Sequence, residues 1–465
     1  MIVLKFGGSS VADAARLRQV ADLVLAARAQ QPCVVLSAMG KTTDALFAAA
    51  RAAAAGDLDS ALQSVADAFA RGDTTARELL ANAPEQLLAC ESALATMREE
   101  LQVLLRGTAL LRELTPRTND AIVAHGERIA TTVFAALLQA RGAMVTHLDA
   151  RCVLRTDARF GAATPIRPAI AALAAQHLAP PLATGSIVVT QGYVGSTSEG
   201  FTTTLGRGGS DWSAALLGEA LRASEVQIWT DVEGVLTADP RIVPGARPIL
   251  TLSPAEAAEL AAFGAKVLHP ATIQPAVEAG IPVTVRHTQR PLGSFTTIDP
   301  RRATTARNGL AALATRGPVT VLTMTSTRML AASGYLARLF AAFGELGICV
   351  DLVVTAEVAV SCTVEPDAPL ERLVQALDGL ARVEILRDRA IVCGVGEGLR
   401  TAPHVVERAC RALGSITPEL IGFGGNERNL SFVVRQSEAA LAMQRLHTEF
   451  FTERANRAAA AEVSR

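Results

Sequence analysis

The chain has 465 residues, of which 50% are hydrophobic and 19% charged, so it is long enough for two to four domains and far from a disordered composition. Its 44 Lys and Arg nearly balance 45 Asp and Glu, and without a long basic run a nucleic-acid surface is not expected. The seven cysteines form no CxxC pair, which favours reduced thiols in a cytoplasmic protein over disulfides or a zinc site. Neither a signal peptide nor a membrane span is expected from the apolar runs.

The first 290 residues alternate short apolar strands with helices. A strand over 2–6, broken by Gly7-Gly8, a helix over 12–29 and a strand over 34–36 form a βαβ unit, which implies a parallel sheet covered on both faces. The same alternation continues with a long helical stretch at 44–114, helices at 124–141 and 212–221, and strands at 187–190, 226–229 and 283–285. This pattern predicts one doubly wound, mostly parallel α/β domain over residues 1–290.

A boundary is predicted at 291–317, which is rich in glycine and proline and contains Arg301-Arg302. Beyond it the order β-α-β-β-α occurs twice, over 318–389 and 390–465, which is the size of a ferredoxin-like α+β module. One α+β domain without internal symmetry is the alternative. The sequence also leaves open whether the second module follows the first or wraps around it.

The segment from Lys5 to Val11 has the order strand, Gly-Gly, helix, which suits anion binding because glycines let the backbone approach a phosphate and a helix N-terminus supplies free N–H groups. A simple turn is the alternative. The run Gly40-Lys41-Thr42 is no Walker A motif, because that motif requires a glycine where this chain has Val35.

The run from Thr204 to Asp211 places Arg207 among three glycines, where a guanidinium can clamp a carboxylate in a bidentate manner. Asp211 precedes the helix expected from Trp212, and so it either takes part in chemistry or caps that helix. Further along, Thr230-Asp231 lies at the end of a predicted strand, which is where ligands bind in parallel sheets. Lys266 lies in an apolar segment and is a second candidate for binding a ligand. The alternative is that Lys266 is a surface lysine whose aliphatic stem packs on apolar residues.

Five phrases together resemble the aspartate kinase family of the amino-acid kinase superfamily: KFGGSSV (5–11), TTLGRGGSD (203–211), WTDVEGV (229–235), TADPR (237–241) and FGAKVLHPAT (263–272). The similarity extends over nearly the whole chain, and the two C-terminal modules resemble the regulatory ACT domains of that family. Members often carry a tyrosine where this chain has Leu236, so a ring contact with the nucleotide is lost or replaced.

The resemblance implies a role for each matching residue. Lys5 and Lys266 hold the ATP phosphates, Asp211 orients these lysines, and Mg²⁺ bridges the phosphates. The remaining ATP-binding residues implied are Gly7, Gly8, Ser9, Thr230, Asp231, Leu236, Arg241 and Val267. For the substrate, Arg207 clamps the α-carboxylate and Glu127 meets the ammonium, with further contacts from Ser37, Thr43, Gly208, Gly209 and Ser210.

The first C-terminal module resembles the effector site of lysine-sensitive members. Its loop would contribute Met329, Ala332, Tyr335 and Leu336, and the facing wall Val350, Asp351, Ala356 and Glu357. Ala331, Ala332 and Ala356 replace polar groups that are common in lysine binders, so feedback by lysine or threonine is a hypothesis motivated by Asp351 and Glu357. Pairing of such modules implies a homodimer or homotetramer.

The reaction implied is ATP-dependent phosphorylation of the L-aspartate side chain to 4-phospho-L-aspartate, the first step toward lysine, threonine and methionine. The attacking carboxylate has a reference pKa of about 3.9 and is already an anion at neutral pH, so no general base is required. Two alternatives remain: another carboxylate or carbamate kinase of the superfamily, and an inactive amino-acid sensor.

Overall fold

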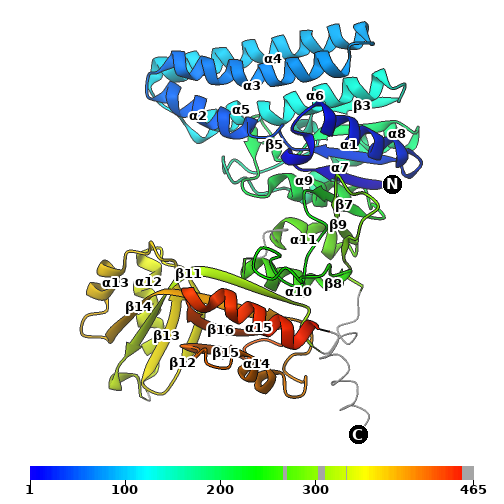
Figure 1. The fold of residues 1–465 in the computed structure, drawn as a ribbon. Helices are drawn as coiled ribbons and strands as arrows, with labels where there is room; N and C mark the ends of the chain where they lie inside the picture. Colours follow the sequence, from blue (N-terminus) through cyan, green and yellow to red (C-terminus); the bar gives the residue numbers. More distant parts are fainter. Residues whose placement is uncertain (265–269, 302–308, 331, 453–465) are drawn as a thin grey trace. The chain divides into compact units, whose positions relative to one another are not determined.

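The computed structural model describes residues 1–264, 270–301, 309–330 and 332–452 (Figure 1). The chain divides into two compact units. The first contains Met1–Val235, Leu250–Pro254 and Val267–Arg301, and the second contains Leu236–Ile249, Ala255–Lys266 and Arg302–Arg465. Residues 236–249 and 255–266 thus belong with the C-terminal modules, although they lie before residue 290 in the sequence.

The first unit is built on an eight-stranded sheet with the order β3-β4-β2-β1-β7-β9-β10-β8. All neighbouring strands are parallel except β9 and β10, which confirms the predicted mostly parallel sheet. The strands are β1 (Ile2–Phe6), β2 (Pro32–Leu36), β3 (Val145–Leu148), β4 (Ile187–Gln191), β7 (Val226–Thr230), β8 (Thr251–Leu252), β9 (Val283–His287) and β10 (Thr296–Ile298), with a separate hairpin of β5 (Val194–Ser196) and β6 (Thr202–Thr204).

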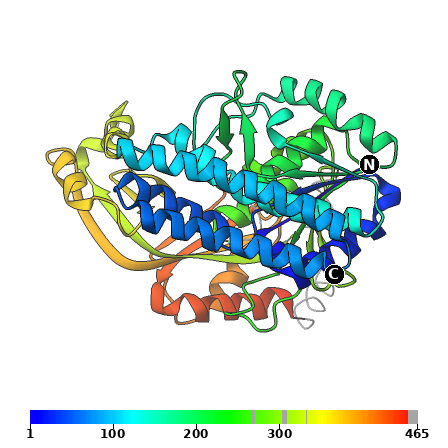
Figure 2. The ribbon, with the colours of Figure 1, turned by 90° about the horizontal axis from the view of Figure 1, so that it is seen from above.

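Every residue of the central strands β1, β2 and β4 is buried, because helices cover both faces of the sheet. On one face lie α1 (Ala14–Ala26), α5 (Pro116–Val123) and α6 (His125–Ala140), and on the other α7 (Arg167–His177), α8 (Ala179–Ala183), α9 (Gly209–Ala220) and α11 (Pro270–Glu278) (Figure 1). The predicted helical stretch at 44–114 forms α2 (Thr42–Ala54), α3 (Leu58–Leu79) and α4 (Pro84–Leu111), and α3 and α4 run side by side (Figure 2).

Two of the helix starts that differ from the sequence prediction have a clear local cause. Residues 8–11 form a short 3₁₀ turn, and α1 begins only at Ala14, because the side chain of Asp13 caps it by accepting from the Arg16 N–H at 2.9 Å. Helix α9 begins at Gly209, three residues before the predicted start, because Gly208 takes the left-handed conformation at its N-terminus (φ 74°).

The second unit holds one six-stranded antiparallel sheet with the order β12-β13-β11-β14-β16-β15. Its strands are β11 (Ala312–Thr325), β12 (Val350–Thr355), β13 (Ala359–Val364), β14 (Arg382–Val395), β15 (Leu420–Phe423) and β16 (Asn429–Arg435). Strand β14 runs through residues 389 and 390, where the sequence predicted that one module ends and the next begins. Two packed clusters cover the sheet, one with α12 (Tyr335–Glu345) and α13 (Leu370–Ala376), the other with α14 (Val405–Leu413) and α15 (Ala439–Phe451).

The pairing of β11 with β14 shows how the two modules share this sheet. Residues 319–325 of β11 pair with 382–389 of β14, which completes the first module in the order β12-β13-β11-β14. Residues 312–316 pair with 391–395, which completes the second module in the order β15-β16-β14-β11. In each module the long strands β11 and β14 thus form one half of a four-stranded sheet. The predicted repeat is confirmed, and the fourth strand of its second copy comes from the chain that precedes the first copy.

Residues 116–140 form a helical stretch that is long and apolar enough to cross a membrane by composition alone. In the structure 89% of its apolar window is buried against the sheet and the neighbouring helices. Burial of that extent is typical of a core helix, and it gives α5 and α6 the fixed position from which Asp120 and Glu127 reach the functional site.

Candidate active site

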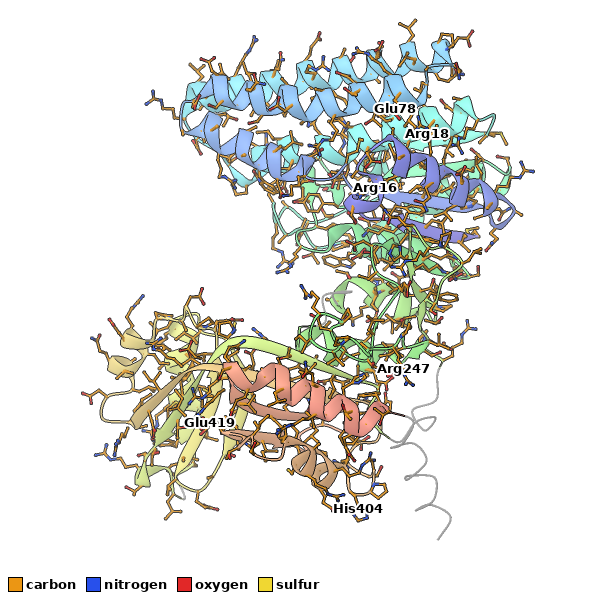
Figure 3. The ribbon with its side chains drawn as sticks, viewed as in Figure 1. Arg16, Arg18, Glu78, Arg247, His404 and Glu419 are labelled. Atoms are coloured by element: carbon orange, nitrogen blue, oxygen red, sulfur yellow. The ribbon has the colours of Figure 1, made fainter. Side chains whose placement is uncertain are left out.

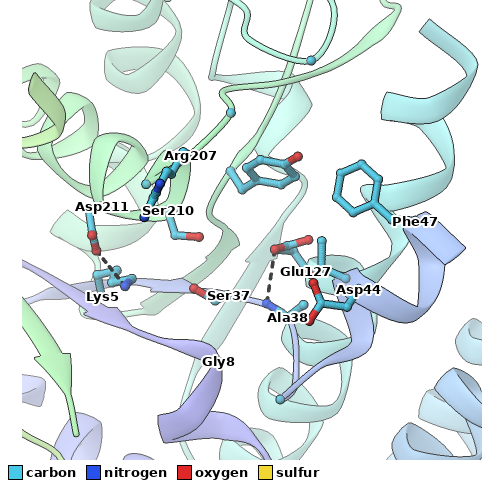
Figure 4. Close-up of a pocket in the computed structure, with 17 residues that line it drawn as sticks. Lys5, Gly8, Ser37, Ala38, Asp44, Phe47, Glu127, Arg207, Ser210 and Asp211 are labelled. Atoms are coloured by element: carbon cyan, nitrogen blue, oxygen red, sulfur yellow. Dashed lines mark hydrogen bonds and ion pairs between the residues drawn. The ribbon is translucent and has the colours of Figure 1, made fainter. Parts of the chain in front are cut away.

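A cavity of about 690 Å³ opens in the first unit where β1 and β2 end and α9 begins (Figure 4). Loops that follow the carboxyl ends of parallel strands commonly form such a site. The cavity brings together Lys5, Asp211, Gly8 and all seven predicted substrate-binding residues. Its lining is Lys5, Gly8, Ser37, Ala38, Gly40, Thr43, Asp44, Phe47, Glu127, Gly161, Tyr193, Gly206, Arg207, Gly208, Gly209, Ser210 and Asp211.

Lys5 and Asp211 form an ion pair at the floor of this cavity, with Lys5 Nζ 2.6 Å from Asp211 Oδ1. Lys5 is the penultimate residue of β1, and Asp211 lies in the first turn of α9. The side chains are only 11% and 17% exposed, so the pair is largely shielded from water. The alternative that Asp211 caps α9 is wrong, because Gly208 occupies the N-cap and no side chain makes a capping hydrogen bond there.

The turn after β1 lies directly against the turn after β2. Gly40 donates its backbone N–H to the carbonyl of Gly8 at 3.1 Å, and a Cβ on Gly8 would lie 2.9 Å from the Ala38 carbonyl oxygen. Only glycine therefore allows this approach. Gly7 is fixed by its N–H, which donates to the Trp229 carbonyl at 3.2 Å. The backbone of the turn at Gly7 and Gly8 is therefore fixed next to Lys5, and Gly8 lines the cavity.

A second, smaller cavity of about 150 Å³ lies where β7 and β9 end. It contains three of the predicted ATP-binding residues, Ser9, Thr230 and Asp231, together with Ser10, Arg16, His287, Thr288 and Gln289. Arg16 donates to the Ser9 carbonyl at 2.6 Å. The structure therefore brings part of the predicted nucleotide set to the sheet edge that carries Lys5.

Four predicted ATP-binding residues have no described place in this site. Lys266 and Val267 lie outside the described residues, as does His269. Leu236 and Arg241 belong to the second unit, where Arg241 pairs with Asp239 at 2.6 Å. The roles of these four residues stay predictions.

Glu127 presents a buried carboxylate to the cavity. Its Oε1 accepts the Ala38 N–H at 3.3 Å, whereas its Oε2 has no hydrogen-bond partner within the described part of the chain (Figure 4). Burial raises the pKa of Glu127 to about 8. A buried oxygen without a partner is costly, so this position suits a ligand that brings a positive hydrogen-bond donor.

Arg207 presents a positive charge to the same cavity. Its side chain lines the cavity, is exposed, and makes no hydrogen bond or ion pair with any residue the structure describes. Gly206 and Gly208 on either side both have φ of 74°, a conformation that favours glycine. The local sequence thus turns the backbone sharply twice and leaves the guanidinium available to a ligand.

Sequence reasoning missed several lining residues, among them Asp44, Phe47, Gly161 and Tyr193. Two of these could have been predicted from the sequence. Phe47 lies one helical turn beyond Thr43 on α2, and Tyr193 follows the end of β4. Gly161 could not, since it reaches the cavity only through a tertiary contact. Within the residues described there is also no cluster of three or more His, Cys, Asp or Glu that could hold a metal.

The predicted effector residues do not form one group within a single chain. Antiparallel pairing places Val350 opposite Val364, at one end of β12, and Thr355 opposite Val360, at the other. Asp351 and Ala356 are therefore about 17 Å apart along the chain. Met329, Ala332, Tyr335, Leu336 and Glu357 lie at the Ala356 end, where Ser326 N–H bonds the Val358 carbonyl.

Two predicted effector residues already have partners in the second unit. Asp351 Oδ1 accepts from Arg316 at 2.7 Å, and Arg316 also pairs with Glu365. Tyr335 is buried and donates its hydroxyl to the Leu380 carbonyl at 2.6 Å, so it has a structural contact irrespective of any effector.

A doubly wound α/β unit whose sheet edge gathers a shielded lysine, two glycine turns, a free guanidinium and a buried carboxylate has the features of a kinase that acts on a small amino acid. Residues 1–287 match the model of the amino acid kinase family, and residues 392–450 match that of an ACT domain. The lysine-sensitive aspartokinase 3 of Escherichia coli is 38% identical over 464 residues, which cover 97% of this chain and 99% of that protein.

Two solved structures agree. Aspartokinase III of E. coli in complex with lysine and aspartate (T-state) has a TM-score of 0.82, and the same enzyme in complex with aspartate and ADP (R-state) has 0.79. Each is 37% identical and covers 97% of this chain and 100% of the other. The chain therefore belongs to the amino acid kinase family and, within it, to the aspartokinases. Its reaction is phosphorylation of aspartate on the route to lysine, threonine and methionine, with regulation through ACT domains.

The raised pKa of Glu127 predicts a pH-dependent stability. In the unfolded chain the carboxyl group titrates at about 4.3, whereas in the folded state it keeps its proton up to about pH 8. Between these values only the folded state binds the proton, so the free energy of unfolding falls as the pH rises, by an amount on the order of 5 kcal/mol. Glu127→Gln cannot ionise and should escape this loss, so its melting temperature relative to wild type should rise steadily from pH 5 to pH 8.

An exposed carboxylate provides the control for this measurement. Glu99 lies on the outer face of α4, and Glu99→Gln should run parallel to wild type over the same pH range. Parallel curves for Glu127→Gln as well would show that Glu127 ionises normally in the folded protein.

Proposed function

We propose that the 690 Å³ cavity binds L-aspartate beside the terminal phosphate of ATP, and that Lys5, Arg207 and Glu127 each contact a different group of these two ligands. The observation that carries this proposal is the meeting of two cationic side chains and one buried carboxyl group with an unpartnered oxygen in one cavity of the described chain. Arg207 suits the α-carboxylate, Glu127 suits the ammonium, and Lys5 with Gly8 suits phosphate oxygens. An amino acid held at both ends in this way directs its side-chain carboxylate along the cavity.

The chemistry then needs positioning and charge stabilisation more than proton transfer. The side-chain carboxylate of aspartate is ionised at neutral pH and attacks the terminal phosphorus of ATP directly. The main barrier is the approach of one anion to a polyanion, and Lys5 lowers it by placing a positive charge at the transferred group. Asp211 holds the Lys5 ammonium in place, and Gly8 and Ser9 supply backbone or hydroxyl donors. Gly7 fixes this turn, because its own N–H donates to the Trp229 carbonyl. The products are ADP and 4-phospho-L-aspartate.

ATP is the proposed phosphoryl donor, with Thr230 and Asp231 beside its binding site and Lys266, Val267, Leu236 and Arg241 contributing as the family resemblance implies. Support comes from the small cavity at the ends of β7 and β9 and from the ADP complex of the E. coli enzyme. Mg²⁺ usually keeps several waters and binds through substrate phosphates, which needs no dedicated protein cage. When bound, Mg²⁺ would neutralise part of the phosphate charge.

Lysine is the proposed effector, and a homodimer is the proposed assembly, with a homotetramer as its larger form. The E. coli relative is lysine-sensitive, and the acidic pair Asp351 and Glu357 suits a cationic ligand better than threonine. Since these residues lie at opposite ends of β12, an edge strand, antiparallel pairing with β12 of a second copy would bring Asp351 of one chain near Glu357 of the other. The effector site would then form between two chains.

The cytoplasm is the proposed location. All seven cysteines are free, and four of them, Cys33, Cys90, Cys362 and Cys393, are buried. Burial raises the pKa of each of these four thiols to about 12, which keeps them protonated and unreactive. Reduced thiols of this kind fit a reducing compartment.

An assay of ADP release across several acceptors tests the substrate assignment. Aspartate should be turned over, and hydroxylamine should trap its acyl phosphate as a hydroxamate. Glutamate, N-acetylglutamate and carbamate should give at least about 100-fold lower kcat/KM, because each misplaces a group that Arg207, Glu127 or Lys5 contacts. Turnover with only one of the other acceptors would assign a different kinase of the superfamily, and no turnover with any of them would favour an amino-acid sensor.

Replacement of Lys5 by alanine should lower kcat by at least about 100-fold, because one preorganised charge at the transferred phosphoryl is removed. Asp211 then lacks its partner, so the melting temperature should fall, and turnover is compared at a temperature at which the variant is folded. Arg18→Ala is the matched control: Arg18 lies on α1 and pairs with Glu78 at 2.9 Å, outside both cavities (Figure 3). Turnover of Lys5→Ala equal to that of the control would refute the role of Lys5.

Calorimetry with lysine and threonine tests the effector. Lysine should release or absorb measurable heat and lower turnover, threonine should do neither, and Asp351→Ala should weaken lysine binding about 10-fold or more. Neither heat nor a change in activity with either amino acid would discard feedback through this module.

A further inference from the structure

Two loops that form one wall of the large cavity meet at a single buried carboxylate, that of Asp120. This residue lies in α5, has no exposed surface, and accepts three hydrogen bonds. Its Oδ2 accepts the N–H of Gly161 at 2.8 Å and the N–H of Thr204 at 2.9 Å, and its Oδ1 accepts the hydroxyl of Thr204 at 2.8 Å. Asp120 lies 41 residues from Gly161 and 84 from Thr204 in sequence.

The first of these loops carries Arg207. Thr204 is the last residue of β6, and Arg207 follows three residues later. The Thr204 carbonyl accepts the Ala163 N–H at 2.9 Å, and the Leu205 N–H donates to the Tyr193 carbonyl at 2.9 Å. The backbone that leads to Arg207 is therefore fixed at successive peptides. Because the Arg207 side chain makes no hydrogen bond or ion pair with any residue that the structure describes, the position of this backbone sets the region that its guanidinium can reach.

The second loop, residues 157–164, packs against the first loop. Residues 157–164 close on themselves, since Asp157 Oδ1 accepts the N–H groups of Arg159 at 3.1 Å and Thr164 at 2.9 Å. Gly161 lies at the tip of this loop and, like Gly206, lines the cavity. A Cβ on Gly206 would lie only 3.2 Å from the Gly161 carbonyl oxygen, so the two loops touch beside Arg207.

Burial of a carboxylate has a large desolvation cost, which an apolar side chain in α5 would avoid. This burial raises the pKa of Asp120, and the three hydrogen bonds oppose the rise. The contacts that offset the cost all belong to the cavity wall. We propose that Asp120 is a positioning residue for phosphoryl transfer: it fixes the loop of residues 205–208 so that Arg207 meets the α-carboxylate of the substrate. This inference rests on the proposed role of Arg207.

The test is steady-state kinetics of the full-length enzyme with Asp120→Ala and Asp120→Asn. Asp120→Ala should raise the KM for aspartate at least about 10-fold and leave the KM for ATP within about twofold, because only the aspartate clamp loses its anchor. Asp120→Asn should restore the KM for aspartate to within about threefold of wild type, since its amide oxygen can accept both N–H groups and its amide nitrogen can donate to the Thr204 hydroxyl. A residue that only stabilised the fold would change the melting temperature without this split in KM.

Three companion variants separate the possible outcomes. Asp73→Ala removes another partly buried carboxylate, which pairs with Arg98 on the outer helices, and should leave both KM values unchanged. Arg207→Ala should raise the KM for aspartate, and if it does not, the proposed function fails rather than the role of Asp120. If Arg207→Ala raises the KM and a folded Asp120→Ala does not, the positioning role is overturned.

A variant that keeps the carboxylate decides the case in which Asp120→Ala does not fold. Thr204→Val removes one of the three hydrogen bonds and keeps both backbone contacts. It should raise the KM for aspartate about three- to tenfold. An unchanged KM for aspartate in Thr204→Val would overturn the proposal, as would an equal rise in the KM values for aspartate and ATP.

Discussion

The ion pair of Lys5 and Asp211 is the contact on which the active site depends. A lysine this well shielded needs a partner, because an uncompensated charge in such a place is strongly destabilising. The pair joins the end of the first strand to the start of a helix some 200 residues later, and it exists only because β1 is central in the sheet and α9 packs on it. In the proposed function, the same carboxylate would keep the ammonium directed at the phosphate of a bound nucleotide. One contact would then serve both the free and the bound enzyme.

The division of cations between lysine and arginine follows the chemistry of the ligands. Of the 44 Lys and Arg in the chain, only Lys5, Lys41 and Lys266 are lysines. Arginine therefore supplies nearly every positive charge of this chain, and its planar guanidinium is well suited to surface ion pairs. In the proposed function Lys5 places a compact charge at a phosphate, whereas Arg207 provides the fork that matches a carboxylate. Two cations in one cavity are thus suited to two different anions.

The sequence predicts those parts of the fold and the site that depend on residues close together in the chain. Strands β1, β2, β4 and β7 were found because continuous apolar runs mark strands that are buried on both faces. Lys5, Arg207 and Asp211 were found in glycine-rich motifs at strand ends, whereas Glu127, Ser37 and Thr43 came only from the family resemblance. The start of α9 was placed three residues too late, because a left-handed glycine at the N-cap leaves no distinctive side chain to recognise. Asp120 and Gly161 were missed, since their roles arise from contacts across 41 and 84 residues.

The second unit shows a different limit of sequence reasoning. Its repeat was visible, but the shared strand was not, because a 14-residue strand that serves two modules looks like two short ones when a polar stretch interrupts it. Since residues 312–316 complete the second module, neither module has a full sheet without the other. The chain also passes between the two units at Val235 and Leu236, five residues after Thr230. The peptide that joins the two units at this point is therefore close in sequence to the strand end that carries Thr230 and Asp231 of the proposed nucleotide site.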